Sequence, residues 1–175
     1  MSSQSFYNIA FKGLSQGKHL FEYDIDGKFF EEFGGGVVDE GKVKVLVTLE
    51  KQSALMILWF DVEGTVAVQC DRCLEIYNQP IKGKDRIFVK FGEKEFSDGD
   101  DVIWVSANDY QINVAQLIYE FICLAVPIKK IHPEDENGNS TCDPQMIERL
   151  NKYIVRDGEA ANPVWNDLKK LLDNE

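Results

Sequence analysis

Lys42-Val-Lys-Val-Leu-Val-Thr-Leu-Glu50 carries the clearest secondary-structure pattern in this chain. Polar and apolar residues alternate along it, and the apolar members of one face are Val43, Val45, Val47 and Leu49. Because successive side chains of an extended chain point to opposite faces, this pattern predicts a half-buried β-strand. The next segment, Ala54–Asp61, is more continuously apolar, which predicts a central strand.

Further strand-like segments lie on both sides of this pair. Before it come segments around Ser5–Phe11 and Lys18–Asp24, a turn at Asp26-Gly27 and a flexible glycine loop at Gly34–Gly36. After it come Gly64–Cys70, Ile81–Phe91 and Val102–Val105. Turn residues separate these strands closely, and no helix fits between most of them. A mainly antiparallel sheet is therefore expected.

The chain changes character at Asn113, where apolar residues begin to recur at helical spacing. This pattern predicts a helix over Asn113–Val126, with Asn113 as its N-cap and Pro127 at its end. Two shorter helices are predicted at Pro144–Val155 and Pro163–Leu172.

Together these segments predict an α+β fold. We expect a mainly antiparallel, barrel-like or strongly twisted sheet, covered by one longer helix and two short C-terminal helices. The strand-rich part covers about residues 1–105, and the helical part covers about residues 113–172. At 175 residues, with 44% hydrophobic and 11% aromatic residues, the chain has the size and composition of a single domain, 1–175, with a packed core.

The chain is acidic, with 19 Lys and Arg against 30 Asp and Glu and a formal net charge of −11. Proteins that bind nucleic acid directly usually gather a basic surface, because neutralising phosphates supplies much of their affinity. No such surplus exists over the whole chain. If this protein serves RNA, it uses a local basic patch or works through a protein partner.

No segment predicts contact with a membrane. The most apolar stretches, Ala54–Phe60 and Val114–Ile128, are shorter than the roughly 20 residues that span a bilayer. Met1–Tyr7 lacks the positive stretch and apolar run of a secretory signal. We therefore expect a cytoplasmic protein, in which thiols stay reduced and paired cysteines indicate metal or redox chemistry before disulfides.

The cysteines and histidines suggest a metal site. Cys70 and Cys73 form a C-x-x-C motif at the end of a predicted strand, the usual half-site for tetrahedral zinc. His132 and Cys142 could supply the other half, although the nine residues between them exceed the three to five common in zinc fingers. Two interpretations stay open: a closed, structural zinc site, or reduced cysteines that are packed without a metal. Cys123, inside the apolar helix, is interpreted as a small buried hydrophobe.

A redox interpretation of the motif is disfavoured by its context. Reactive C-x-x-C motifs usually open a helix, whose N-terminal dipole lowers the thiol pKa. Here Leu74–Tyr77 follows with a strand-like alternation. Catalysis of other kinds is not expected either, because the chain has only two histidines and no nucleophile motif.

The predicted contacts to RNA or to a protein partner are the basic residues in the C-x-x-C motif and on the strand that follows: Arg72, Lys82, Lys84 and Arg86. A solvated strand face would explain these residues equally well. Among the tryptophans, Trp59 lies in an apolar run and is predicted to be core. Trp165, beside Lys169 and Lys170, is the better candidate for stacking on a base, although anchoring of the last helix is favoured there.

Three segments follow one another in an informative order. The first is Cys70-Asp-Arg-Cys-Leu74, and the second is Glu120-Phe-Ile-Cys-Leu-Ala-Val-Pro127, followed by His132 and Cys142. The third is Asn162-Pro-Val-Trp-Asn-Asp-Leu-Lys-Lys-Leu171. Together they resemble the YceD family, the large ribosomal RNA subunit accumulation proteins, in its C-x-R-C-L signature, its helix end with a downstream His and Cys, and its closing D-P-R-W-x-x-L-x-x-L.

The chain also departs from the family pattern. Asn162 replaces an Asp, Val164 replaces an Arg, and the loop between His132 and Cys142 is longer than in many members. The first 65 residues share only the strand-rich character of the family.

The resemblance implies a factor in the synthesis, processing or stability of large-subunit ribosomal RNA. Its expected partners are this RNA or a ribosome-assembly protein, and neither a catalytic reaction nor a small-molecule substrate comes with the family. Two alternatives are retained: a zinc-stabilised protein-interaction module without direct RNA contact, and a thiol oxidoreductase that uses the C-x-x-C motif.

Overall fold

The structure is a computed structural model that describes residues 3–34, 36–92, 99 and 101–154. Its contacts divide the chain into two compact units: Met1–Cys70 with Ile76–Lys130, and Asp71–Glu75 with Ile131–Glu175. We call these the sheet unit and the cysteine unit and describe each by itself. That residues 1–175 form a single domain stays a prediction. The predicted helix Pro163–Leu172 and Trp165 lie outside the described residues.

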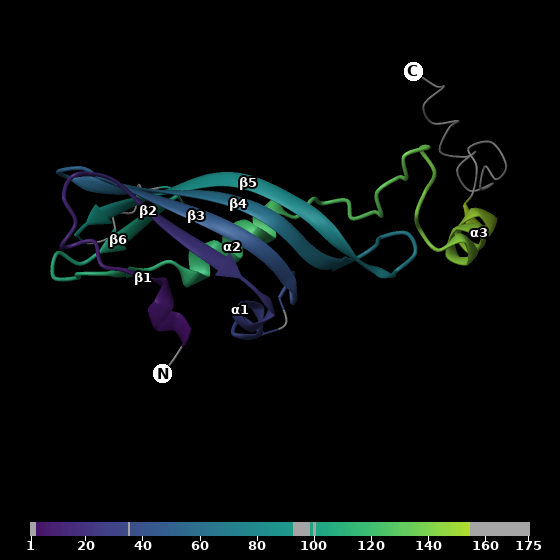
Figure 1. The fold of residues 1–175 in the computed structure, drawn as a ribbon, viewed down its shortest axis with the longest axis horizontal. Helices are drawn as coiled ribbons and strands as arrows, with labels where there is room; N and C mark the ends of the chain where they lie inside the picture. Colours follow the sequence, from purple (N-terminus) through teal and green to yellow (C-terminus); the bar gives the residue numbers. More distant parts are fainter. Residues whose placement is uncertain (1–2, 35, 93–98, 100, 155–175) are drawn as a thin grey trace, which may run out of the picture. The chain divides into compact units, whose positions relative to one another are not determined.

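The sheet unit is built on five strands in the order β2-β3-β4-β5-β6 (Figure 1). Their bounds are Gly17–Ile25 for β2, Gly41–Lys51 for β3, Leu55–Gln69 for β4, Ile76–Phe91 for β5 and Val102–Val105 for β6. The pairs from β2 to β5 are antiparallel, and β5 pairs with β6 in parallel. The α+β prediction is confirmed. Among the described residues the sheet stays open between β2 and β6, so the barrel-like alternative is not confirmed.

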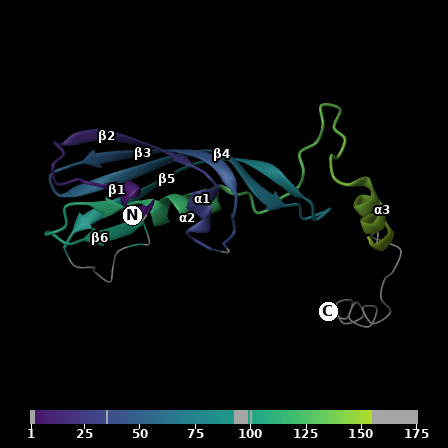
Figure 2. The same ribbon diagram turned by 60° about the horizontal axis from the view of Figure 1, so that its bottom comes forward.

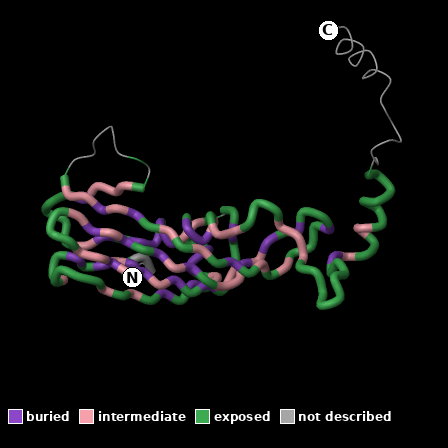
Figure 3. Tube along the Cα trace, turned by 90° about the horizontal axis from the view of Figure 1, so that it is seen from above, coloured by how far each residue is buried: buried purple, intermediate pink, exposed green. Residues whose placement is uncertain are grey.

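The alternating segment Lys42–Glu50 forms most of β3, and its burial alternates as predicted. Val43, Val45, Val47 and Leu49 are all buried, whereas Lys42 and Lys44 are exposed. The adjacent β4 lies in the middle of the sheet, as its apolar run predicted. Figure 3 shows buried and more exposed residues alternating along the strands. One face of the sheet therefore belongs to the core, and we call the opposite one the outer face.

Helix α2 (Ala115–Ala125) packs against the buried face of the sheet (Figure 2). Its buried side chains include Leu117, Ile118 and Ile122, and the ring of Phe121 lies 4.8 Å from that of Phe60 on β4. The N-cap is Val114 rather than the predicted Asn113, which is the last residue of β7 (Ile112–Asn113) and accepts the Ala115 N–H on its side-chain oxygen at 2.9 Å. The helix ends before Pro127, where the ring would block further turns.

The N-terminal segments differ from the prediction. Around Ser5–Phe11 the chain forms a short 3-10 helix, η1 (Ser3–Tyr7), and then β1 (Asn8–Ile9), which pairs with β7 (Ile112–Asn113). The predicted turn at Asp26-Gly27 starts helix α1 (Gly27–Glu31) instead. The Asp26 carboxylate accepts the Lys28 N–H at 3.1 Å and so caps this helix, which buries two phenylalanines, Phe29 and Phe30.

The described part of the cysteine unit consists of the turn at residues 71–75, a loop and helix α3 (Pro144–Tyr153). Asp143 caps α3 by accepting the Gln145 N–H at 3.0 Å, and Pro144 occupies its first turn. The helix ends two residues before the predicted Val155, which lies outside the described residues. No residue of α3 is buried.

Candidate functional site

The four residues predicted as metal ligands come together in the structure. Cys70, Cys73, His132 and Cys142 each offer one ligand atom, and these atoms all lie within 4.8 Å of one another. The Nδ1 atom of His132 is 3.4 Å from the Cys73 sulfur and 3.7 Å from the Cys142 sulfur. The three cysteines are buried and His132 is half-buried. We call this group the Cys/His cluster.

A self-closed loop explains how the long spacing between His132 and Cys142 is compatible with a shared site. The Asp135 carboxylate accepts the backbone N–H groups of Asn137 and Asn139 at 2.9 and 2.7 Å. The hydrogen bonds from Asn139 lower the pKa of the Asp135 carboxyl, so its acceptor form persists to low pH. A bridge between Glu134 and Ser140 closes the loop. The loop thus brings Cys142 back beside His132, although nine residues lie between them.

The C-x-x-C half of the cluster lies between two strands. Cys70 follows the last residue of β4, and β5 begins at Ile76. Between them Leu74 adopts a φ of 65°, a left-handed conformation that is rare outside glycine and costs about 1–3 kcal/mol. No helix opens at Cys73, so the thiols lack the helix dipole on which a reactive C-x-x-C depends.

The donor set fits zinc. Three sulfurs and one imidazole nitrogen are the donors of common structural zinc sites, which are tetrahedral. Sulfurs about 2.3 Å from one zinc lie roughly 3.8 Å apart, so the observed grouping needs little adjustment. All four cysteines of the chain are free thiols, and Cys123, which is partly buried on α2, is not a member of the cluster.

The four predicted contact residues are divided between the two units. Arg72 belongs to the cysteine unit, whereas Lys82, Lys84 and Arg86 point outward at alternate positions of β5. Lys82 forms an ion pair with Glu63 at 2.9 Å, which raises the pKa of Lys82 through the hydrogen bond and the charge of that carboxylate. Lys84 forms an ion pair with Asp61. Both lysines therefore have carboxylate partners directly across the β4–β5 ladder.

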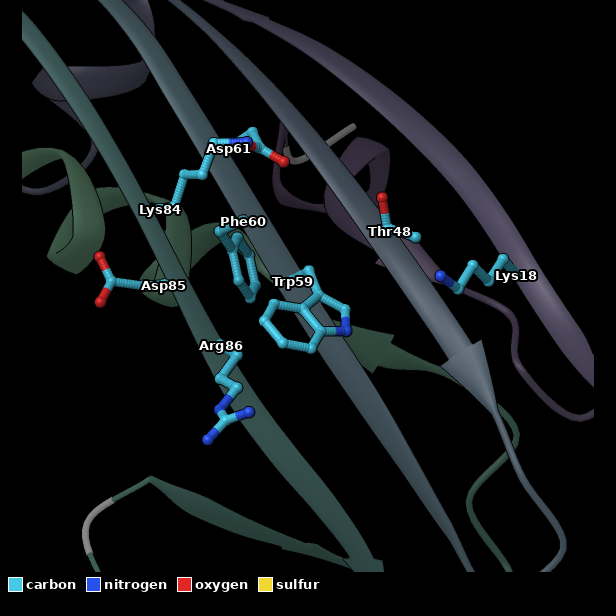
Figure 4. A pocket seen from close by; sticks show the side chains of 8 residues that line it. All are labelled: Lys18, Thr48, Trp59, Phe60, Asp61, Lys84, Asp85 and Arg86. Carbon is cyan, nitrogen blue, oxygen red and sulfur yellow. The ribbon is translucent and has the colours of Figure 1, made fainter.

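Arg86 has a different environment from these two lysines. Its guanidinium lies 5.3 Å from the ring centre of Trp59 and 5.1 Å from that of Phe88. Figure 4 shows Trp59 and Arg86 next to each other on adjacent strands. The prediction that Trp59 is core was wrong, because its side chain is on the outer face and is 37% exposed. The alternation of Leu58, Phe60 and Val62 into the core could have revealed this orientation.

The described chain is thus an α+β protein with a candidate four-ligand metal centre. It belongs to the YceD family: the family model described as "Large ribosomal RNA subunit accumulation protein YceD" matches residues 58–172. The match includes most of β4, all of β5 and α2, and all four residues of the Cys/His cluster. No curated protein and no solved structure matches the chain. In the part of the chain that the structure describes, no helix is long and apolar enough to cross a membrane.

Proposed function

We propose that this protein is a non-enzymatic factor that supports the synthesis, processing or stability of large-subunit ribosomal RNA. The observation that carries the proposal is the family match over residues 58–172, whose description names the accumulation of this RNA. The protein would act by binding the RNA or a ribosome-assembly protein.

The arrangement of titratable groups supports a role without catalysis. General acid–base or metal-assisted hydrolysis needs several such groups converging on an accessible reacting atom. Among the described residues, the Cys/His cluster is the one group of three or more His, Cys, Asp or Glu side chains placed to hold a metal. With four protein ligands, a tetrahedral site has no open position for a water or a substrate.

We propose a structural role for a metal at this cluster. Cys70, Cys73, His132 and Cys142 would hold zinc, which when bound cross-links the C-x-x-C turn to the loop that precedes α3. Burial supports this proposal, because Cys73 and Cys142 are the only buried residues in the described part of the cysteine unit. Such a small apolar contribution cannot offset the entropy of ordering a chain segment.

Deleting the gene and measuring large-subunit RNA in a cold-grown culture tests the proposed function. We expect the mature RNA to fall relative to small-subunit RNA, or its precursors to accumulate, and a plasmid copy of the gene to restore both. Unchanged RNA and unchanged precursors in the deletion strain would contradict the proposal.

The alternative of a zinc-stabilised protein-interaction module without RNA contact is favoured by two observations on charge. The net charge is −11, and the carboxylates of Glu63 and Asp61 pair with two of the predicted basic contacts, Lys82 and Lys84. RNA binding measured over a series of salt concentrations separates the alternatives, because direct phosphate contacts weaken steeply as salt rises. No binding even at low salt favours the interaction module.

A further inference from the structure

We infer that the outer face of the sheet around Trp59 and Arg86 binds single-stranded RNA, with unpaired bases stacked on its aromatic rings. This inference rests on the proposed function and deepens it by naming the surface and the form of the RNA. We call the surface the stacking face and define it by five residues: Trp59, Arg86, Phe88, Lys90 and Trp104.

The five residues come from three adjacent strands and share one face. Trp59 on β4 lies directly across from Arg86 on β5, and Lys90 on β5 lies across from Trp104 on β6. Arg86, Phe88 and Lys90 alternate along β5 with residues of the opposite face, such as the buried Val89. The Lys90 ammonium lies 5.4 Å from the ring centre of Trp104. Two cations on β5, Arg86 and Lys90, thus lie next to the exposed ring of Trp59 and the half-buried rings of Phe88 and Trp104.

The stacking face is accessible. A depression of about 630 Å³ opens over the outer face beside Trp59, and its lining includes Lys18, Thr48 and Arg86 (Figure 4). Helix α2 packs on the opposite face of the sheet, which holds the buried side chains. A tryptophan that is 37% exposed leaves apolar surface in contact with water, and a stacked base would cover it.

Charge favours RNA over an acidic or purely apolar partner at this surface. The depression beside Trp59 is lined by three cations, Lys18, Lys84 and Arg86, and by two carboxylates, Asp61 and Asp85. Lys84 pairs with Asp61 there, and Glu50 lies across from Lys18. On a chain of net charge −11, a depression whose lining carries one more cation than carboxylates, beside aromatic rings, is complementary to phosphates and bases.

Spacing indicates single-stranded RNA. Trp59 and Phe88 lie on neighbouring strands and are offset by two residues, since Trp59 pairs with Arg86. Side chains in this diagonal relation are about 7–8 Å apart, whereas stacked nucleotides rise only about 3.4 Å per residue. The rings therefore cannot contact successive bases of a continuous stack. They suit splayed bases of a loop or an unpaired segment, which aromatic and arginine side chains recognise by stacking.

Fluorescence anisotropy of the full chain with a labelled mixed-sequence single-stranded RNA, and with the same RNA annealed to its complement, tests the inference. We expect tighter binding to the single strand. Trp59→Leu keeps an apolar side chain on the strand and should weaken binding by roughly 5- to 150-fold. Arg86→Gln should weaken binding and reduce the slope of log affinity against log salt by about 1.

Lys44→Gln provides the matched control, because Lys44 is exposed on the same outer face of β3 but lies across from Glu63, outside the stacking face. Circular dichroism of every variant verifies folding. Wild-type affinity in Trp59→Leu and Arg86→Gln, or equal affinity for the duplex, would overturn the inference. A Trp59→Leu variant that fails to restore ribosomal RNA in the deletion strain but binds RNA normally would show that the face binds a protein, which also overturns it.

The deletion experiment distinguishes failure of the proposed function from failure of the stacking face as an RNA-binding surface. If deletion lowers large-subunit RNA while the purified protein binds no RNA at low salt, the stacking face is refuted and the proposed function stands. If deletion leaves the RNA unchanged, the proposed function fails whatever the binding assay shows.

Discussion

The two compact units of this protein are stabilised in different ways. The sheet unit buries a continuous apolar core between its sheet and α2, with side chains such as Phe60, Leu58 and Ile118 almost fully removed from water. The described part of the cysteine unit buries only Cys73 and Cys142, and leaves apolar residues such as Tyr153 85% exposed. The sheet unit folds by the hydrophobic effect, and we propose that zinc held by the Cys/His cluster stabilises the cysteine unit.

The largest effect is expected from removal of metal by a strong chelator. Structural zinc contributes about 10–16 kcal/mol to folding in small zinc-binding peptides, so the cysteine unit should lose its fold while the sheet unit keeps it. Hydrogen exchange should show that residues 131–154 lose protection and that β3 and β4 do not. Cys142→Ser should reproduce this pattern, and Cys123→Ser, outside the cluster, serves as its control. Loss of protection in both units at once would contradict the comparison.

Two neighbouring aromatic residues on β4 test which face of the sheet forms the core. Phe60 is 1% exposed on the core side of β4, and Trp59 is 37% exposed on the other side. Phe60→Ala should cost about 3–5 kcal/mol through lost burial and a cavity beside Phe121, as measured by the denaturant midpoint. Trp59→Ala should cost far less. A similar loss of unfolding free energy in both variants would show that the core does not lie on the Phe60 side of β4.

A smaller effect is expected at high pH. Burial, followed by the nearby Tyr7, raises the pKa of Tyr23 from 10.0 to about 12. Because the folded-state pKa is the higher one, the neutral phenol stabilises the fold fully below pH 10, and this contribution is lost as pH rises towards 12. The loss is at most about 2–3 kcal/mol at 1.36 kcal/mol for each pKa unit. Thermal unfolding of Tyr23→Phe should decline less than wild type over this range, and an identical decline would contradict the prediction.

The smallest effect is expected at the N-cap of α3. Asp143→Ala removes the acceptor of the Gln145 N–H and should destabilise the helix by about 1 kcal/mol. Hydrogen exchange over residues 144–153 measures this change, and Asp143→Asn, which keeps an acceptor, is the control. Because no residue of α3 is fully buried, packing compensates little for a lost cap. Unchanged exchange in Asp143→Ala would show that other contacts hold the helix.

Residue pattern alone predicted the parts of the fold that depend on local periodicity. The alternation that begins at Val43 identified β3, and the helical spacing after Asn113 identified α2. Helix α1 was missed because Asp26-Gly27 is as typical of a turn as of a helix cap, and only the burial of Phe29 and Phe30 decides between them. The parallel pairing of β6 with β5 is not encoded in either strand's alternation.

The candidate site was predicted in residue identity but not in arrangement. Three cysteines and a histidine were sufficient to propose a metal site. The nine-residue spacing between His132 and Cys142 did not reveal that Asp135 closes the loop and brings these two ligands together. The ion pairs of Lys82 and Lys84, and the outward side chain of Trp59, depend on cross-strand register. Register is a long-range property, which no short motif contains.

Elemental analysis of the purified protein, run beside a Cys70→Ser variant, tests most directly whether a metal centre holds the cysteine unit. We expect one zinc ion per chain in the wild-type protein and a marked loss of zinc in the variant. Wild-type protein that contains no metal after purification without chelators, yet keeps residues 131–154 folded, would contradict it.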